Sequence, residues 1–166
     1  MKLSRTAGII LIIAFNIAID QISKVLVRAN FEYGEIKQLI GDTFIMQYVE
    51  NEGAFLGMGS DMNPTLKLIV LLILPTVVLG YLIYYIIKNK SLDKLSLIAL
   101  CSIAGGGIAN VFDRIVFGSV TDFFYIHFND TIRTGIFNVA DMSVTFGILV
   151  LLYTTIFSKK KTEQPA

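Results

Sequence analysis

The sequence Phe-Asn-Val-Ala-Asp, from Phe137 to Asp141, places an amide and a carboxyl directly before an apolar run that extends to Phe157. Counted from Asn138, the run is long enough for a helix that crosses a membrane. An ionisable side chain at such a position is costly, so it requires a partner or a chemical task. We therefore expect a membrane-spanning helix with a functional acid, Asp141, at one end.

A second carboxyl, Asp122, lies upstream in the sequence Val-Thr-Asp-Phe, among apolar and aromatic residues. Two acids that both adjoin membrane-spanning sequence are suited to acid–base catalysis by a pair of carboxyls. Our hypothesis is that the rest of the chain brings Asp122 and Asp141 together at one membrane face.

The composition is that of a membrane protein. The chain has 166 residues, of which 54% are hydrophobic, and its mean hydropathy is +0.68. This length allows one domain with a few spans, so we treat residues 1–166 as a single integral membrane domain. The net charge of +1 predicts no nucleic-acid partner.

Several classes of hydrolase lack their signatures in this sequence. The chain has one histidine, His127, and no His-Glu-x-x-His, which argues against a zinc protease. It also has no Gly-x-Ser-x-Gly, the motif of many serine hydrolases. Cys101 stands alone in an apolar run and is interpreted as a small hydrophobic residue. We expect no metal and no cofactor.

Hydropathy predicts an all-α membrane protein with four transmembrane helices, a small extracytoplasmic β-hairpin insert and an interfacial segment. No small-x-small cleavage site follows the first apolar run, which indicates an uncleaved span. The expected spans are approximately 6–28, 64–88, 94–117 and 138–158, and the outer segments are 29–63 and 118–137.

Local features refine this outline. Residues 36–49 predict a strand, a turn at Gly41 and a second strand. The aromatic segment 118–136 is typical of an interfacial helix or ribbon, with His127 as an interface residue. Pro75 is expected to kink the second span, and the glycines at 105–107 offer a small-residue surface for close helix packing.

The positions of the cations predict the orientation. With four spans, one side of the membrane receives Lys2, Arg5, Lys88, Lys90, Lys94, Lys159, Lys160 and Lys161. Opposite loops carry mostly acids, so both termini are expected in the cytoplasm. Leu95 to Asp113 spans about 27 Å of helix, and Asp141 to Phe157 about 24 Å. The carboxyls are therefore expected near the outer edge of the hydrocarbon core.

Polar residues also recur along two of the predicted spans. Asn16, Asp20 and Lys24 share one helical face, and Asp20 with Lys24 could form an ion pair or take part in chemistry. On the third span, Asn110 and Asp113 lie on one face with Arg114 beside it.

Five motifs resemble, in order and spacing, those of the lipoprotein signal peptidase (signal peptidase II) family. They are Asp20-Gln21-x-x-Lys24, Asn51-x-Gly53-Ala54, Asn110-x-x-Asp113-Arg114, Val120-x-Asp122-Phe123 and Phe137-Asn138-x-Ala140-Asp141. The resemblance covers essentially the whole chain. Glu50 and Phe55 depart from the family pattern in the outer insert.

The resemblance implies an intramembrane aspartic endopeptidase that cleaves bacterial prolipoproteins just before their diacylglyceryl-cysteine. Its catalytic aspartates match Asp122 and Asp141. The matching substrate-binding or supporting residues are Asn51, Gly53, Asn110, Asp113, Arg114, Asn138, Asp20 and Lys24. It further implies lipid-modified prolipoproteins and membrane lipid as partners, no cofactor, a monomer, and a place in the bacterial cytoplasmic membrane.

Two other interpretations of the acids stay open at this stage. An ion-coupled transporter or proton channel would place acids near the midplane, preferably with internal repeats, and this sequence shows no repeat. A scaffold would merely pair its acids with Lys24 and Arg114.

Overall fold

The computed structural model describes residues 4–54, 58–129 and 131–159. The predictions that concern Lys2, Phe55, Lys160 and Lys161 lie outside these residues. In chain order the elements are α1 Arg5–Asn30, β1 Ile36–Ile40, β2 Phe44–Asn51, α2 Pro64–Lys67, η2 Leu68–Ile73, α3 Leu74–Lys88, α4 Lys94–Phe117, β3 Val120–Ile126 and α5 Val139–Lys159.

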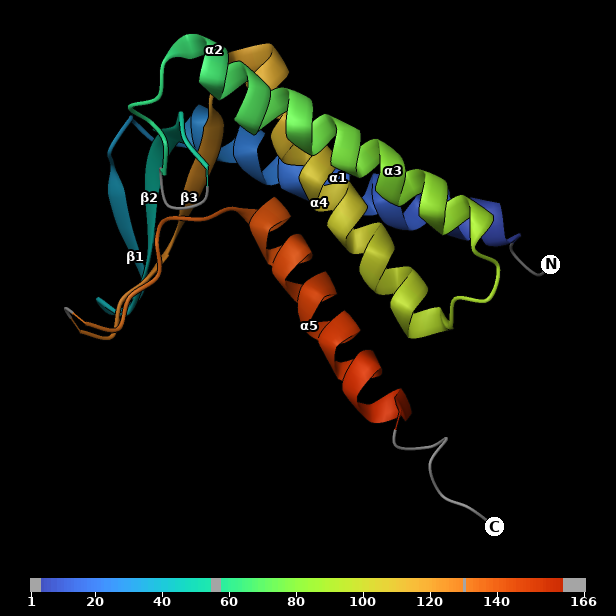
Figure 1. The fold of residues 1–166 in the computed structure, drawn as a ribbon. Helices are drawn as coiled ribbons and strands as arrows, with labels where there is room; N and C mark the ends of the chain where they lie inside the picture. The colour runs from blue at the N-terminus through green and yellow to red at the C-terminus, as the bar shows by residue number, and fades with distance from the viewer. Residues whose placement is uncertain (1–3, 55–57, 130, 160–166) are drawn as a thin grey trace.

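In this described part of the chain, four helical segments are long and apolar enough to cross a membrane: Arg5–Asn30, Pro64–Lys88, Lys94–Phe117 and Val139–Phe157. The sheet lies at one end of these helices, and the N-terminus and the α3–α4 connection lie at the other (Figure 1). The expected fold, four helices with a small β insert, is confirmed.

Three antiparallel strands form one sheet in the order β1-β2-β3. The predicted hairpin is β1 and β2, and Gly41 adopts a φ of +51° at its turn, where a glycine is favoured. Segment 118–136, predicted as an interfacial helix or ribbon, contributes a third strand to this sheet. Its first residues form β3, which pairs along β2.

A third strand has a physical reason, because a two-stranded hairpin is marginal alone and leaves β2 with an unpaired edge. Gly118, with a φ of +79°, ends α4 in the left-handed conformation and turns the chain directly into β3. The residues Val120–Phe123 are all buried, so β3 lacks the alternation that identifies a strand in sequence.

Helix α4 is the central helix, and its glycines set the distances to its neighbours. Each of the three consecutive glycines faces a different helix: Gly105 meets Asn16 of α1, Gly106 the Ala140 carbonyl of α5, and Gly107 Leu79 of α3. A Cβ at any of them would lie too close to the facing atoms. The predicted small-residue surface is therefore confirmed, and it brings α5 against α4 beside Asp141.

The second span, for which a kink at Pro75 was predicted, is interrupted by a π-helix just before that proline. The segment Leu68–Ile73 is π-helical, and α3 begins directly after it with Pro75 in its first turn. The Thr76 hydroxyl donates to the Leu72 carbonyl at 2.6 Å.

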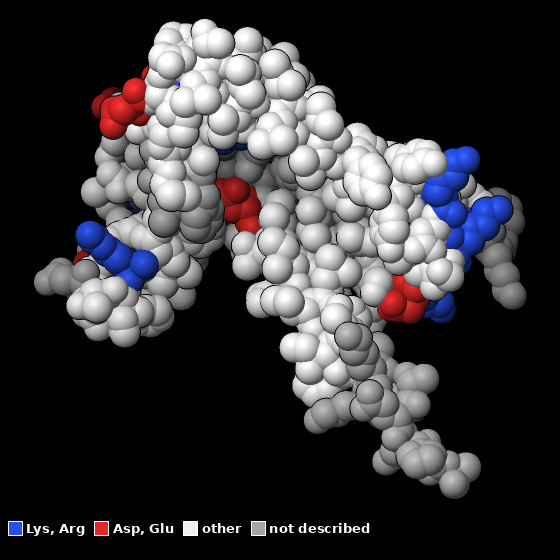
Figure 2. Space-filling model, in the orientation of Figure 1, with Lys and Arg blue, Asp and Glu red and all other residues white. Residues whose placement is uncertain are grey.

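The end of the bundle remote from the sheet holds an apolar core and a group of cations. Cys101 is buried there with Ile86, as expected of a small hydrophobic residue. Arg5 donates to the carbonyls of Ile86 at 2.8 Å and Asn89 at 2.7 Å, which joins the start of α1 to the end of α3. Figure 2 shows Lys and Arg side chains gathered at this end.

Candidate active site

A cavity of about 50 Å³ lies between the sheet and the nearby ends of α4 and α5. Its lining residues come from β2 and the loop after it, α4, β3, the segment leading into α5, and α5 itself: Asn51, Ala54, Asn110, Arg114, Val120, Asp122, Ile136 and Asp141. Both predicted acids thus line one cavity, although one comes from a strand and the other from a helix. Figure 2 shows acidic side chains in the hollow between the sheet and the helices.

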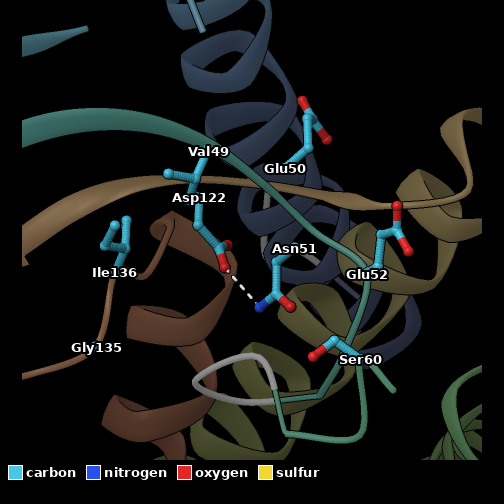
Figure 3. Close-up of a pocket in the computed structure, with 8 residues that line it drawn as sticks. All are labelled: Val49, Glu50, Asn51, Glu52, Ser60, Asp122, Gly135 and Ile136. Atoms are coloured by element: carbon cyan, nitrogen blue, oxygen red, sulfur yellow. Dashed lines mark hydrogen bonds between the residues drawn. The ribbon is translucent and has the colours of Figure 1, made fainter. Parts of the chain in front are cut away.

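Asp122 is buried in β3, with 3% of its surface exposed. Its Oδ1 accepts from Asn138 Nδ2 at 2.6 Å, and its Oδ2 accepts from Asn51 Nδ2 at 2.9 Å (Figure 3). Burial raises the pKa of Asp122 to about 7, the Asn51 hydrogen bond opposes this, and the nearby charge of Asp141 adds to it. A carboxyl with this pKa holds its proton for much of the time at neutral pH.

Asp141 lies in the first turn of α5 and forms a capping box with Asn138. The Asn138 Oδ1 accepts from the Asp141 backbone N–H at 2.9 Å, and Asp141 Oδ2 accepts from the Asn138 backbone N–H at 3.2 Å. The other oxygen, Oδ1, accepts from Asn110 Nδ2 at 2.9 Å. The start of a helix favours a negative charge, so this position suits an ionised carboxylate.

Three asparagine amides face the two acids, and each has its orientation fixed by a second contact. Asn51 and Asn138 each accept a backbone N–H at Oδ1, in both cases at 2.9 Å. The Asn110 Oδ1 accepts from the Lys24 ammonium at 2.8 Å. Because backbone N–H groups and ammonium groups can only donate, the amide nitrogens must point toward the carboxyls. The site thus surrounds its acids with donors.

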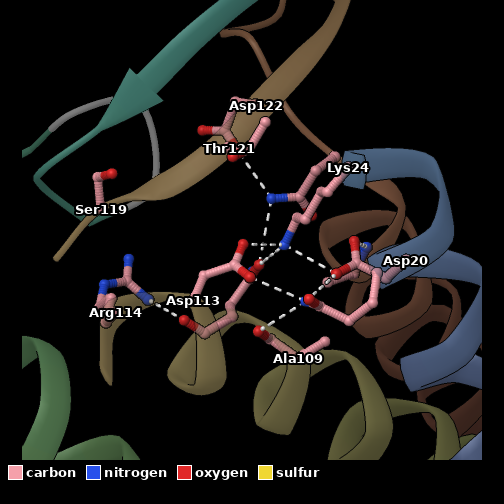
Figure 4. A network of polar contacts seen from close by, with 12 residues as sticks. Asp20, Lys24, Ala109, Asp113, Arg114, Ser119, Thr121 and Asp122 are labelled. Atoms are coloured by element: carbon pink, nitrogen blue, oxygen red, sulfur yellow. Dashed lines mark hydrogen bonds and ion pairs between the residues drawn. The ribbon is translucent and has the colours of Figure 1, made fainter. Parts of the chain in front are cut away.

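A second acidic cluster, which we call the Lys24 cluster, consists of Asp20, Lys24 and Asp113 (Figure 4). All three side chains are fully buried, and the Lys24 Nζ lies 2.8 Å from Asp20 Oδ2 and 2.7 Å from Asp113 Oδ2. Of the two sequence alternatives for Asp20 and Lys24, the structure shows the ion pair. It is fully buried, however, and it includes an acid from α4.

The Lys24 cluster also supports the start of α5. The Asp20 Oδ1 accepts from the Ala140 backbone N–H at 2.8 Å. Gln21 adds a hydrogen bond to Asp113 Oδ1 at 2.8 Å. The cluster therefore fixes the end of the helix that carries Asp141.

Arg114 and Gly53 lie on the side of the cavity formed by the loop after β2. The Arg114 Nη2 donates to the Gly53 carbonyl at 2.9 Å, which holds that loop against α4. Within the described residues, the buried Nε of Arg114 has no hydrogen-bond partner. In the same part of the chain, no lysine or arginine forms an ion pair with Asp122 or Asp141. The scaffold interpretation thus applies to the Lys24 cluster and not to this pair.

Some residues around the cavity were not among the predicted site residues. Val120 and Ile136 line it, and Gln21 braces Asp113. Gln21 belongs to one of the family motifs, which could have identified it, whereas Ile136 has no sequence signal of its own.

No three His, Cys, Asp or Glu side chains among the described residues are placed to hold a metal ion together.

The sequence is similar to one family over most of its length. Residues 12–157 match the family model described as Signal peptidase (SPase) II. A lipoprotein signal peptidase of Clostridium tetani is 33% identical over 86% of this chain and 88% of its own length. One of Clostridium acetobutylicum is 30% identical over 92% of this chain and 96% of its own length.

The fold is also similar to that of a solved structure, described as a bacterial membrane enzyme determined by the in meso method at 2.3 Å resolution. The TM-score is 0.82 at 24% sequence identity, and the match covers 96% of this chain and 93% of the other. This likeness shows a shared fold.

Proposed function

The chain belongs to the signal peptidase II family, and from that premise we propose that it is an aspartic endopeptidase that removes signal peptides from lipid-modified bacterial prolipoproteins. One observation carries the aspartic assignment. Asp122 and Asp141 line the same small cavity, with amide donors on both carboxyls and no cation paired to either among the described residues. Such a pair can exchange protons, which a neutralised ion pair does less readily.

In the proposed mechanism the two acids share one proton and titrate as a unit. Asp122, with its pKa raised to about 7 by burial, holds this proton at rest. Asp141, at the start of α5, is the ionised partner. It takes a proton from water as the water attacks the scissile carbonyl. Asp122 polarises that carbonyl and then protonates the leaving amine.

We assign the binding of the peptide backbone to Arg114 and Asn51. Both line the cavity as hydrogen-bond donors, and both contact the loop after β2. A wider pocket of about 420 Å³ includes Asp122 in its lining; the other lining residues are Val49, Glu50, Asn51, Glu52, Ser60, Gly135 and Ile136 (Figure 3). This pocket is open enough to take the peptide that follows the cleaved bond.

We assign the diacylglyceryl group to an apolar groove of about 470 Å³ beside Asp141. The groove runs along the face of α5 that carries Met142, Phe146 and Leu149, and it adjoins Phe137. Each CH₂ group that leaves water contributes about 0.8 kcal/mol, so two acyl chains anchor a substrate firmly. Anchoring at this groove would hold the bond beside the cysteine at the level of the acids.

The proposal places the protein in the bacterial cytoplasmic membrane as a monomer, with both termini in the cytoplasm. The cations at the end of the bundle remote from the sheet support this orientation, because positive residues favour the cytoplasmic side. The sheet and the acids would then lie at the outer face.

The test compares one prolipoprotein with and without its diacylglyceryl group, in one detergent and at equal concentration. We expect the unmodified precursor to be cleaved at least about 100-fold more slowly, because remote binding energy no longer orients the bond. A gel-shift assay measures both rates. Equal rates would show that the site recognises peptide sequence alone and would remove the lipid from the proposed function.

A further inference from the structure

The two faces of the sheet differ at the point where β2 ends. Antiparallel pairing places Glu50 opposite Thr121, and Val49 opposite Asp122. Successive side chains of a strand point to opposite faces, so Asn51 and Asp122 face the catalytic cavity whereas Glu50 and Thr121 do not. Figure 3 shows Glu50 directed away from Asn51 and Asp122. Glu50 borders the 420 Å³ pocket, but the mechanism above gives its carboxylate no role.

The Glu50 carboxylate is nevertheless the centre of a hydrogen-bond cluster, which we define as Arg28, Tyr48, Glu50, Ser119 and Thr121. Its Oε1 accepts from the Tyr48 hydroxyl at 2.9 Å and from the Thr121 hydroxyl at 2.8 Å. Its Oε2 accepts from the Ser119 hydroxyl at 2.5 Å. Three hydroxyl donors thus converge on one carboxylate, and hydrogen bonds to an ionised acceptor are stronger than neutral ones.

Arg28 connects this Glu50 cluster to the helices. Its Nη1 donates to Thr121 Oγ1 at 2.7 Å, and its guanidinium carbon lies 4.4 Å from the centre of the Phe117 ring. Because a guanidinium can only donate, the Thr121 hydroxyl must direct its own proton to Glu50. The cluster therefore links α1, the end of α4 and two strands in one fixed pattern of donors and acceptors.

Each strand residue at the centre of the cluster is the neighbour of a site residue. Glu50 precedes Asn51, and Thr121, which is 1% exposed, precedes Asp122. A change in register between β2 and β3 here would turn both site residues away from the cavity. A displacement of about 1 Å in a catalytic group can cost about 100-fold in rate.

We propose that Glu50 is a positioning residue for peptide cleavage: from the reverse face of the sheet, its carboxylate aligns Asn51 and Asp122 with Asp141. The inference rests on the proposed function, because it assumes that Asp122 and Asp141 react together. Glu50 departs from the family pattern in the outer insert. Under this proposal the insert helps to position Asp122 relative to Asp141.

The experiment measures kcat and KM on a lipid-modified prolipoprotein, with the thermal midpoint of each purified variant. For Glu50→Ala we expect kcat to fall at least about 10-fold, since Asp122 loses its alignment with Asp141. KM should rise by a smaller factor, because Asn51 and the pocket that Glu50 borders contact the proposed substrate. Glu50→Asp keeps the charge and should recover most of the loss. Glu32→Gln, an exposed acid of the same insert, is the matched control and should behave as wild type.

Two results would overturn the proposal: a folded Glu50→Ala protein with wild-type kcat, or one in which only KM changes. If Glu50→Ala does not fold, Thr121→Val removes only the hydroxyl between Glu50 and Arg28. A kcat that falls by a larger factor than KM rises then supports the proposal, and a wild-type kcat refutes it. Asp122→Asn is assayed alongside. An active Asp122→Asn protein refutes the proposed function itself, whereas an inactive one beside a fully active Glu50→Ala refutes only the role of Glu50.

Discussion

Two pairs of carboxyls lie close together at the sheet end of the helices, and their surroundings differ. Asp20 and Asp113 are fully buried on either side of Lys24, which forms an ion pair with each. Asp122 and Asp141 face a cavity and receive hydrogen bonds from amides. A neutralised pair has little tendency to exchange protons, whereas a pair held only by neutral donors retains it. The comparison therefore separates a structural cluster from a candidate catalytic one.

Asn110 joins the two pairs. It accepts from Lys24 through Oδ1 and donates to Asp141 through its amide nitrogen. The Lys24 cluster thus orients a donor of the site without contacting the reacting groups itself. The same cluster fixes the start of α5 through the Ala140 backbone N–H. Its contribution to activity is expected to act through structure.

The largest effect on stability is predicted for Lys24→Met, which removes the cation and leaves two buried acids unpaired. Breaking a buried ion pair on one side costs about 3–5 kcal/mol, so this variant should unfold at much lower denaturant or temperature. The measurement is equilibrium or thermal unfolding in detergent. The control, Lys24→Met combined with Asp20→Asn and Asp113→Asn, removes the uncompensated charge and should regain part of the stability. A Lys24→Met protein as stable as wild type would show that the cluster is not structural.

A smaller effect is predicted for the dependence of the cleavage rate on pH. It concerns only the pair formed by Asp122 and Asp141. The pKa of Asp122 is raised from its ordinary value of 3.8 to about 7. The protonated partner is therefore lost as the pH rises through about 7, and the cleavage rate should fall over that range. A rate that is flat or rises between about pH 6 and 9 would contradict the assignment of the proton to Asp122.

The same raised pKa predicts the sign of a stability change. The folded state binds the Asp122 proton more tightly than the unfolded state does. The contribution of this protonation to the free energy of unfolding is therefore fully present below 3.8, the pKa of Asp122 in the unfolded chain. It is lost as the pH rises through the folded value of about 7. Asp122→Asn removes this dependence, and unfolding at several pH values measures it.

The sequence predicted the elements whose signals are local. The four spans, the hairpin and the small-residue surface at 105–107 all follow from patterns within short windows. Asp20 and Lys24 lie one helical turn apart, so the sequence could predict their ion pair as one of two alternatives. The meeting of Asp122 with Asp141 was inferred from depth and from the family motifs.

The parts that were missed depend on contacts between distant segments. β3 pairs with β2 across the whole of two spans, and its continuous burial hides the period of a strand. The addition of Asp113 to the Lys24 pair follows from the packing of α4 against α1. The hydroxyl of Thr121 reaches Glu50 through the β2–β3 pairing. No local pattern in the sequence specifies which hydroxyl meets which carboxylate.

The most direct test of the division between the two pairs measures turnover and thermal stability together for Asp122→Asn, Asp141→Asn and Asp113→Asn. An amide cannot exchange the proton, so the first two variants should purify as stable proteins and lose cleavage of a lipid-modified prolipoprotein by at least about 100-fold. Asp113→Asn should lose stability, and its activity should fall with its folded fraction. Near-wild-type turnover in Asp122→Asn or Asp141→Asn, or a fully stable but inactive Asp113→Asn, would contradict the account.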